Sequence, residues 1–549
     1  MRNFRSYGAV LAGYTAAIIS VAASANPSGV FDIAVARVTC ISLGVITEAA
    51  FNGVFAPEHP FTAVRKGLAS FLAQAAGMAA RALRGEDNQA ECPRLFALAV
   101  ELDSTGEYAA AGSPAARRKF GHLRGASAAV MAELASAQAL REHVGRYGVE
   151  DETLLSRAAR FMEDVSNSPA GKRDDAHALL ADIRAALREE AGEAHSLPRL
   201  LLLVRLEGLL VRVQEAQTRG ALFFDPHAPD SRMPFHFHVD WIAAIRNGAR
   251  AFLAVLAAAA LWTLTAWPSG GSFLVIVAVV SGLFATRPNS VAAGIGFLQG
   301  ATIAAVVAAA CNFALLSPVS HFAMLALILC PFLIAGGLAM KIPRIAGPAR
   351  GFTMFFVSLV GPDNASRPEL ASFLNTVLAL LGGIGFGMLV FALILRRDPR
   401  RDRRRLHEAV RRELAAIGRN PSAWTQHAWL MRTADRAALQ AATNAAVPKE
   451  EAEADLRGML SALLIGHAAI GLSALPRASA DPLVGAALRR LGDGDPDRLA
   501  RTCRLAARRL MRRIESARPP DRDALKAALM MEDIGEAAQN HADFLGKHR

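Results

Sequence analysis

Two charged residues lie inside a long apolar stretch near the start of the chain, and their chemistry suits anion binding and proton exchange. Arg37 and Glu48 both lie in the segment 33–55. Charged side chains are costly inside a bilayer, so they mark functional positions by default. The Arg37 guanidinium could hold a carboxylate through two parallel hydrogen bonds, and the Glu48 carboxyl could take up and release a proton. They are about three helical turns and about 16 Å apart, so they share a helix face without pairing.

An ordinary structural role is open for each of these residues. The Arg37 stem could lie along its helix while the charged head reaches the outer membrane interface. Glu48 could face a water-filled crevice near the cytoplasmic surface. We therefore treat Arg37 as a candidate substrate contact and Glu48 as a candidate proton-coupling group.

Three further candidates stand at the start of a second apolar block. Arg246 and Arg250 are four residues apart, which places both on one face of a helix. They could attract an anionic substrate from the cytoplasm, or they could simply anchor the helix on the inner side of the membrane. Asp240, just before them, could cap the helix, pair with Arg246 or take part in proton coupling.

Trp262 is a candidate for stacking on an aromatic substrate. It stands with Trp267 at the outer end of the same predicted span, where tryptophan commonly serves as an interfacial anchor. Gln299, Asn312 and Asn375 are polar residues within spans. Hydrogen bonds between helices account for them without a role in transport.

The sequence offers little for enzymatic or cofactor chemistry. It lacks a phosphate-binding P-loop, a G-x-S-x-G nucleophile motif and paired catalytic carboxylates, so we predict a protein that is not an enzyme and uses no cofactor. His236 and His238 have no further ligand nearby, and the five cysteines include no C-x-x-C pair, so no metal site is predicted. The net charge of +12 is not accompanied by nucleic-acid-binding motifs.

Apolar and charged residues are segregated along the chain, and this segregation predicts the fold class. Of the 549 residues, 52% are hydrophobic and 20% are charged. Blocks almost free of charge alternate with blocks rich in Arg, Glu and Asp. The pattern predicts an all-α polytopic membrane protein with transmembrane blocks at 1–56 and 241–396 and with cytoplasmic helical domains at 57–240 and 397–549.

Eight apolar segments are candidates to cross a bilayer about 30 Å thick. The first block contains two of them, at 7–24 and 33–55. The second block contains six, of which the second and fifth are short: 245–266, 272–286, 291–316, 322–340, 349–360 and 372–395.

Two other apolar stretches are interpreted as buried helices of the polar domains. The stretch 200–213 contains Arg205, Glu207 and Arg212, and each charge would cost about 2.5–3.5 kcal/mol at the bilayer centre. The stretch 458–475 is rich in Ala, Gly and Ser, which are only weakly apolar.

The distribution of basic residues predicts the orientation of the spans. The turns on one side hold Arg287, Lys341, Arg344 and Arg350, and the last span runs into an arginine-rich segment at 396–405. The turns on the other side hold a single basic residue. Because cytoplasmic loops collect Lys and Arg, both polar domains are predicted to be cytoplasmic.

The first block resembles the end of the second block. Residues 1–56 and 345–396 each contain an apolar span, an outer turn with Pro and Asn, and a second span that opens with Phe and carries glycines. This comparison predicts that about four spans, the counterparts of residues 241–344, are absent before Met1. The charged start, the apolar run and the sequence Ala23-Ser24-Ala25 are also compatible with a secretory signal peptide.

Ordered landmarks along the chain resemble the fusaric acid resistance family, which includes bacterial aromatic carboxylic acid efflux proteins. The resemblance covers nearly the whole chain, although Cys40 stands where relatives often carry an acidic residue. The landmarks are the segments 7–19, 31–37 and 43–45 with Pro27, then Asp240, Ala243, Arg246, Arg250, the segments 261–263 and 267–270, Arg287-Pro288, and the segment 373–375 with 396–400.

This resemblance implies a function. It implies a multi-pass protein of the cell inner membrane that exports small aromatic or other organic acids, driven by the proton gradient. It also implies a periplasmic adaptor and an outer-membrane channel as partners, and it is compatible with a homo-oligomer. Two alternatives stay open: a passive organic-anion channel, because plant malate channels are distantly similar, and a membrane-anchored scaffold.

Overall fold

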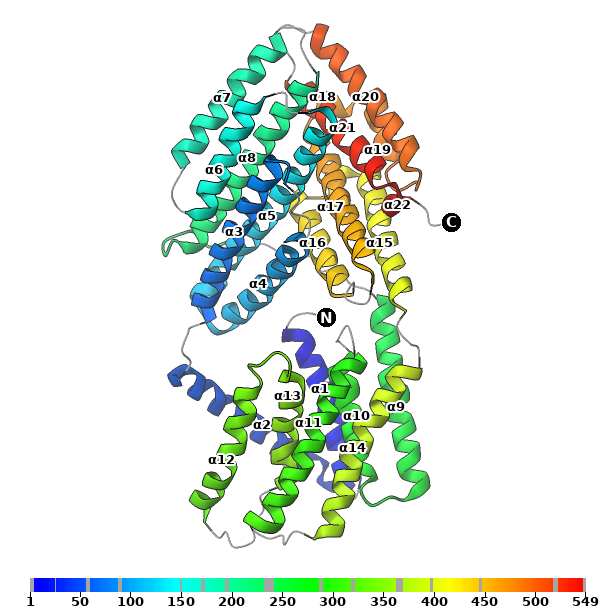
Figure 1. Ribbon diagram of the computed structural model, residues 1–549. Coiled ribbons are helices and arrows are strands. Elements are labelled where there is room, and N and C mark those ends of the chain that lie inside the picture. The colour runs from blue at the N-terminus through cyan, green and yellow to red at the C-terminus, as the bar shows by residue number, and fades with distance from the viewer. Residues whose placement is uncertain are drawn as a thin grey trace. The chain divides into compact units, whose positions relative to one another are not determined.

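The structure is a computed structural model in which the regular elements of the described residues are helices (Figure 1), so the all-α prediction is confirmed. The described residues are 4–24, 26–55, 60–86, 91–148, 151–168, 173–192, 197–231, 241–285, 290–316, 321–361, 369–394, 398–443, 447–516 and 522–546.

Contacts divide the chain into two units, and each unit combines two segments that are far apart in the sequence. Unit 1 comprises residues 1–56 and 239–397, and unit 2 comprises residues 57–238 and 398–549. The apolar segments therefore fold together, and so do the polar segments.

Unit 1 consists of apolar helices at the positions predicted for the spans. Their bounds are α1 (Phe4–Ala23), the short turn η1 (Pro27–Gly29), α2 (Val30–Phe55), α9 (Trp241–Thr265), α10 (Gly270–Ala285), α11 (Ser290–Ala310) continued by the π-helical turn η3 (Cys311–Leu315), α12 (Phe322–Ala339), α13 (Ala346–Val360) and α14 (Leu370–Leu393).

Among the described residues, six helices are long and apolar enough to cross a membrane. Five of them, α2, α9, α11, α12 and α14, belong to unit 1, whereas α10 and the apolar part of α1, Gly8–Ala23, are shorter. The prediction of a polytopic α-helical membrane protein is confirmed by these helices.

The sixth helix that meets this criterion lies in unit 2, and its surroundings are protein. It is α17 (Lys449–Leu472), and 83% of its most apolar 18-residue stretch is buried. The indole Nε1 of Trp429 donates a hydrogen bond to the Leu463 carbonyl at 2.9 Å inside this core. The other stretch in question belongs to α8 (Leu197–Phe224), where Leu203 and Leu206 are fully buried. The interpretation of both stretches as buried helices of the polar segments is confirmed.

Glycines allow α11 and α13 to approach closely. Gly296 and Gly300 on α11 lie against the backbone of α13, and Gly347 and Gly351 on α13 lie against the backbone of α11. Both pairs have the four-residue spacing typical of closely packed spans. A Cβ atom at Gly300 would lie only 2.0 Å from the carbonyl oxygen of Pro348. Only a hydrogen atom fits there, so glycine is required for this contact.

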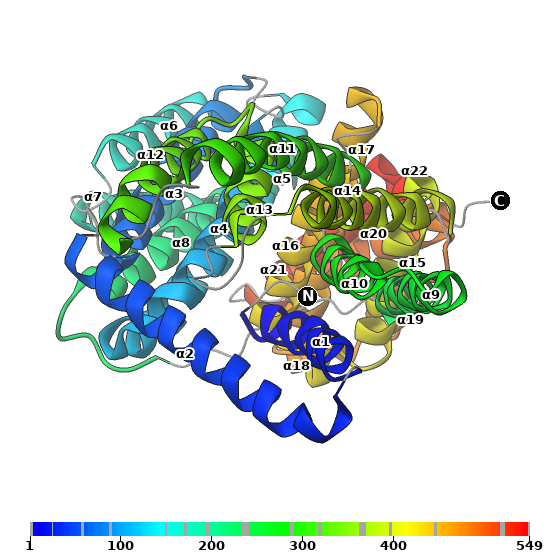
Figure 2. The same cartoon turned by 90° about the horizontal axis from the view of Figure 1, so that it is seen from below.

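A second group of helices in unit 1 surrounds α10. Figure 2 shows α1, α9 and α14 around this helix, and the contacts agree. The buried side chains between α9, α10 and α14 include Ala254, Ala258, Val277 and Ala379. Small residues on α9 and α14 therefore bring their backbones close to α10.

Unit 2 contains the helices of both polar segments. The first segment forms α3 (Pro60–Leu83), α4 (Cys92–Gly112), α5 (Pro114–Tyr147), α6 (Glu152–Asn167), α7 (Arg173–Gly192) and α8. The second segment forms α15 (Pro399–Arg419), η4 (Pro421–Ala423), α16 (Gln426–Thr443), α17, α18 (Pro476–Ser479), α19 (Pro482–Arg489), α20 (Pro496–Ser516), α21 (Arg522–Asn540) and α22 (Ala542–Leu545).

The two polar segments repeat one packing pattern. In the first segment α5 packs against α4 and α8, and α7 packs against α8. In the second segment α17 packs against α16 and α21, and α20 packs against α21. The order of the helices therefore pairs α3 with α15, α4 with α16, α5 with α17, α7 with α20 and α8 with α21.

One hydrophobic core joins the two polar segments. Met131 and Leu134 of the first segment belong to the same buried cluster as Trp429 and Leu460 of the second. The sequence predicts two polar domains, whereas the structure groups the described residues of both in unit 2. A shared core buries helix faces that each segment alone would leave exposed to water.

Local sequence signals start several of these helices. Ser113 caps α5 and accepts a hydrogen bond from the Ala116 amide, with Pro114 as the first helical residue. Asp398 caps α15 in the same way, followed by Pro399. A short polar side chain followed by proline satisfies an otherwise free amide and presets the helical backbone angle.

Candidate functional site

The first two candidates lie on α2, a helix that packs mainly against α1 and η1. The Arg37 side chain is half-buried and Glu48 is exposed. Apolar neighbours such as Leu43 and Ile46 are also exposed, as expected for a helix surrounded by lipid. The structure keeps Arg37 and Glu48 on one helix without bringing them into contact with the candidates on α9, and their assigned roles stay predictions.

Arg250 on α9 is buried and is held by backbone carbonyls of α14. Its Nε donates to the Ile394 carbonyl at 2.8 Å, and its Nη2 donates to the Phe391 carbonyl at 2.7 Å. The guanidinium also lies over the Phe391 ring, 4.9 Å from its centroid. The last carbonyls of a helix lack intrahelical partners, and a cation there also complements the helix dipole. These contacts indicate a capping role for Arg250.

Neighbouring residues of α9 extend the same arrangement. Asn247 donates from Nδ2 to the Ala285 carbonyl at the end of α10, at 2.9 Å. Arg246 lies one turn before Arg250 and is half-buried. Through Asn247 and Arg250, the first turns of α9 therefore hold the carboxyl ends of α10 and α14.

A carbonyl near the end of a third helix, α13, also accepts a hydrogen bond from a polar side chain that the sequence analysis named. Asn312, in the π-helical turn after α11, donates from Nδ2 to the Leu359 carbonyl near the end of α13, at 3.1 Å. Free carbonyls in a bilayer must find donors within the protein. The prediction that Asn312 makes a hydrogen bond between helices is confirmed.

Trp262 packs against the start of α10. A Cβ atom at Gly270 would lie 2.1 Å from Trp262 Cδ1, so the indole occupies the space that a side chain would need. Trp267 donates from Nε1 to Asn375 Oδ1 on α14 at 2.7 Å, and its ring lies 5.7 Å from that of Phe273. The hydrogen bond predicted for Asn375 is confirmed. Stacking of Trp262 on a substrate stays a prediction.

Asp240 lies outside the described residues, as do His236 and His238. Among the residues that the structure does describe, no cluster of three or more His, Cys, Asp or Glu side chains could hold a metal ion.

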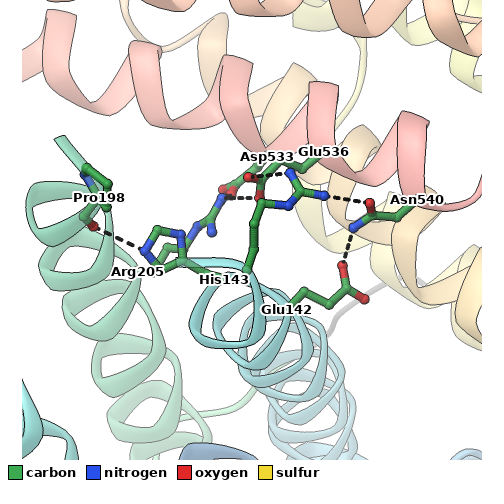
Figure 3. Close-up of polar contacts among 8 residues, drawn as sticks. Glu142, His143, Pro198, Arg205, Asp533, Glu536 and Asn540 are labelled. Carbon is green, nitrogen blue, oxygen red and sulfur yellow. Dashed lines mark hydrogen bonds and ion pairs between the residues drawn. The ribbon is translucent and has the colours of Figure 1, made fainter. Parts of the chain in front are cut away.

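Unit 2 contains a network of charged residues that joins α5 and α8 to α21 (Figure 3). Arg205 on α8 is at its centre, with a side chain only 4% exposed. Its Nε donates to Asp533 Oδ1 at 2.9 Å, and its Nη2 donates to Glu536 Oε2 at 2.9 Å. An almost fully buried guanidinium therefore has two carboxylate partners.

Two residues of α5 complete this network. Arg146 donates to Glu536 Oε1 at 3.0 Å and to Asn540 Oδ1 at 2.8 Å. Asn540 in turn donates from Nδ2 to Glu142 Oε2 at 2.9 Å. The amide thus bridges a cation and an anion, and it links the polar segments through α21.

The surroundings shift the protonation of two groups of α5. Burial raises the pKa of Glu142, but the His541 ring 3.7 Å away and hydrogen bonds from Gln138 and Asn540 outweigh it and lower the pKa to about 2. Burial, followed by the nearby Arg205 charge, lowers the pKa of His143 to about 4. His143 Nε2 lies 3.1 Å from the Pro198 carbonyl, which can only accept, so the neutral ring carries its proton on Nε2.

The sequence did not predict this network. Arg205 was used only as evidence that the stretch 200–213 does not cross the membrane. Asp533 follows it by 328 residues, so no local spacing indicated the pairing. The network links both polar segments of unit 2 through ion pairs and hydrogen bonds between α5, α8 and α21.

The profile of the Fusaric acid resistance protein family matches residues 1–545. A protein named an uncharacterized transporter, from Gluconobacter oxydans, is 27% identical over 97% of this chain and 77% of its own length. A protein named a p-hydroxybenzoic acid efflux pump subunit, from Edwardsiella ictaluri, is 24% identical over 76% of this chain and 63% of its own length.

Another protein named a p-hydroxybenzoic acid efflux pump subunit, from Musicola paradisiaca, is 29% identical over 29% of this chain. No solved structure matches the chain. The chain thus spans about two thirds to three quarters of the relatives that match most of it. The family match and the apolar helices together identify a multi-pass membrane protein, and the chain belongs to the fusaric acid resistance protein family.

Proposed function

We propose that this protein is a transporter that exports small organic acids, with aromatic carboxylic acids as the leading substrate class. The observation that carries the proposal is the family match over residues 1–545, which includes both units. The relatives named as p-hydroxybenzoic acid efflux pump subunits support the substrate class. An export role also accounts for ionisable residues within an apolar span.

In this proposal α2 carries the transport chemistry. The half-buried Arg37 binds the substrate carboxylate, and Glu48 exchanges protons, so that the proton gradient drives export. Arg246, beside the capped helix ends, attracts anions from the cytoplasm, and Trp262 and Asp240 stay candidates for stacking and for proton coupling. Arg250 positions the helices, because two of its five donors are held by carbonyls of α14, and it stays a candidate substrate contact through the others.

The proposal also covers the membrane location of the protein and its partner proteins. It places the spans in the inner membrane and the polar segments in the cytoplasm, as the arginine-rich segment after α14 supports. A periplasmic adaptor and an outer-membrane channel complete the export path. The protein acts as a transporter and not as an enzyme.

The test is efflux of labelled p-hydroxybenzoate from cells that produce the full chain or its variants. Arg37→Ala removes a charge-assisted hydrogen bond worth about 1.5–3 kcal/mol, so we expect export at low substrate concentration to fall by about 10-fold or more. Glu48→Gln is expected to uncouple export from the proton gradient. Thr47→Ala is the matched control, because the Thr47 hydroxyl donates to Leu43 within α2.

Each alternative has its own outcome. Export by both charge variants at the rate of the unmodified protein would contradict the roles of Arg37 and Glu48. Anion currents in liposomes without proton movement would favour a passive channel. A protein that moves no organic acid but co-purifies with a fixed cytoplasmic partner would favour a scaffold.

A further inference from the structure

The first two turns of α15 present arginines to solvent shortly after a span. Arg400, Arg401 and Arg404 are exposed, and they lie within about 100° of one another around the helix axis. Arg401 has a side chain that is 79% exposed, with Asp398 as a distant ion-pair partner at 3.7 Å. These three side chains form what we call the α15 arginine face.

Other arginines of α15 are used within unit 2. Arg403 forms ion pairs with Glu451 and Asp455, and the Asp455 side chain is only 3% exposed. Arg405 lies 3.8 Å from Asp402 and is half-buried. Among the described arginines between residues 398 and 405, the α15 arginine face is therefore the part that the fold leaves available to a partner.

The covalent chain keeps the α15 arginine face near the bilayer. The last residue of α14 is Leu393, and α15 begins at Pro399. Six residues can extend at most about 20 Å, so the first residue of α15 stays within that distance of the end of the span in every arrangement of the units. Arg404, five helical residues further on, adds about 7.5 Å to that reach.

The equivalent position in the other polar segment has the same character. The helix α3 pairs with α15 in the repeated packing pattern, and it begins at Pro60, shortly after α2 ends at Phe55. Arg65 and Lys66 on its second turn are exposed. Cations thus follow a span at both places where the chain passes from an apolar segment into unit 2.

We propose that the α15 arginine face binds the headgroups of anionic phospholipids at the membrane surface. Anionic headgroups are the negative charges that a segment tethered to a span meets at short range. Each arginine near such a surface contributes about fivefold in affinity. The proposal does not depend on which substrate the protein transports.

The helix α20 offers a matched control. Its exposed face carries Arg501, Arg504 and Arg508, so its charge is similar. Its first residue, Pro496, is far along the chain from the last span. If tethering to a span matters, then these arginines contribute little to lipid binding.

The test measures lipid binding by the detergent-purified full chain in native mass spectrometry, with phosphatidylglycerol and phosphatidylcholine as probes. We expect the unmodified chain to prefer phosphatidylglycerol. The triple variant R400Q/R401Q/R404Q is expected to lose about tenfold or more of that affinity, with phosphatidylcholine binding unchanged. The triple variant R400K/R401K/R404K keeps the charge and is expected to bind as the unmodified chain does.

Three results would overturn the proposal. In the first, R400Q/R401Q/R404Q retains full affinity for phosphatidylglycerol although its thermal unfolding is unchanged. In the second, R501Q/R504Q/R508Q loses as much affinity as R400Q/R401Q/R404Q. In the third, free glycerol phosphate competes at concentrations equal to those of the lipid, which would assign the face to a soluble anion.

Discussion

Arg205 illustrates how a single buried charge can determine the pairing of distant helices. Moving a guanidinium out of water is unfavourable unless carboxylates and hydrogen bonds compensate it. Asp533 and Glu536 on α21 supply that compensation. An incorrect docking of α21 would leave these charges buried without partners.

Replacing Arg205 is expected to destabilise unit 2 strongly. Arg205→Met keeps much of the side-chain volume but leaves Asp533 without its cation, and breaking a buried pair typically costs about 3–5 kcal/mol. Denaturant unfolding of the purified protein, followed through the tryptophans of unit 2, measures the loss. The control is Arg157→Met, whose pair with Asp182 is largely exposed and is worth about 0–1 kcal/mol. Equal losses in both variants would contradict this account.

The lowered pKa of His143 predicts how the stability of unit 2 depends on pH. Its pKa is about 4 in the folded protein, below the ordinary value of 6.5, chiefly because of burial. The neutral ring is therefore favoured by folding, and its contribution is complete above pH 6.5. That contribution is lost as the pH falls from about 6.5 through about 4, because the unfolded chain binds the proton first.

The measurement is thermal unfolding of unit 2 between these pH values. His143→Asn removes the group that titrates, so its unfolding temperature is expected to fall less across this window than that of the unmodified protein. Parallel curves for the two proteins would show that another group is responsible.

Some residue roles were predictable from the sequence and others were not. Asn312 and Asn375 were predicted to link helices, because an amide within a span needs a partner. The partners themselves could not be predicted, since a carbonyl at a helix end carries no signal in the sequence. For the same reason the bonds from Arg250 to two carbonyls of α14 were not predicted, and its role as a substrate contact stays a prediction.

At the scale of elements, helix positions followed from composition. Apolar runs bounded by Pro, Gly or charged residues marked α9 to α14 to within a few residues. The pairing of α11 with α13 was missed, although two four-residue glycine spacings, Gly296 with Gly300 and Gly347 with Gly351, were visible. Such spacing identifies a face for close packing but does not name the partner helix.

The contact between α11 and α13 predicts a contrast between two glycines. Gly300→Ala places a methyl group 2.0 Å from the Pro348 carbonyl oxygen, whereas a Cβ atom at Gly337 on α12 meets nothing within 4 Å. We expect Gly300→Ala to destabilise unit 1 by about 1–3 kcal/mol. Gly337→Ala is expected to be neutral or to stabilise by about 0.5–1 kcal/mol. Thermal unfolding in detergent compares the two variants, and equal stabilities would refute close packing at Gly300.

At the scale of the whole molecule, the alternation of apolar and polar segments was readable from charge and hydropathy. The grouping of segments 57–238 and 398–549 in one unit was not. Periodicity reveals which face of a helix is apolar but not which distant helix covers it. Clusters that contain both Met131 and Trp429 arise from shape complementarity across hundreds of residues.

This discontinuous core has a consequence for the order of events at the ribosome. Residues up to 238 emerge long before residue 546, and at about 5–20 residues per second the interval is roughly 15–60 s. During that time α4 and α5 lack their packing partners α16 and α17, while the intervening spans are inserted into the membrane. The newborn chain therefore exposes the apolar faces of these helices for many seconds, an interval in which chaperones that cover apolar surface would protect it from aggregation.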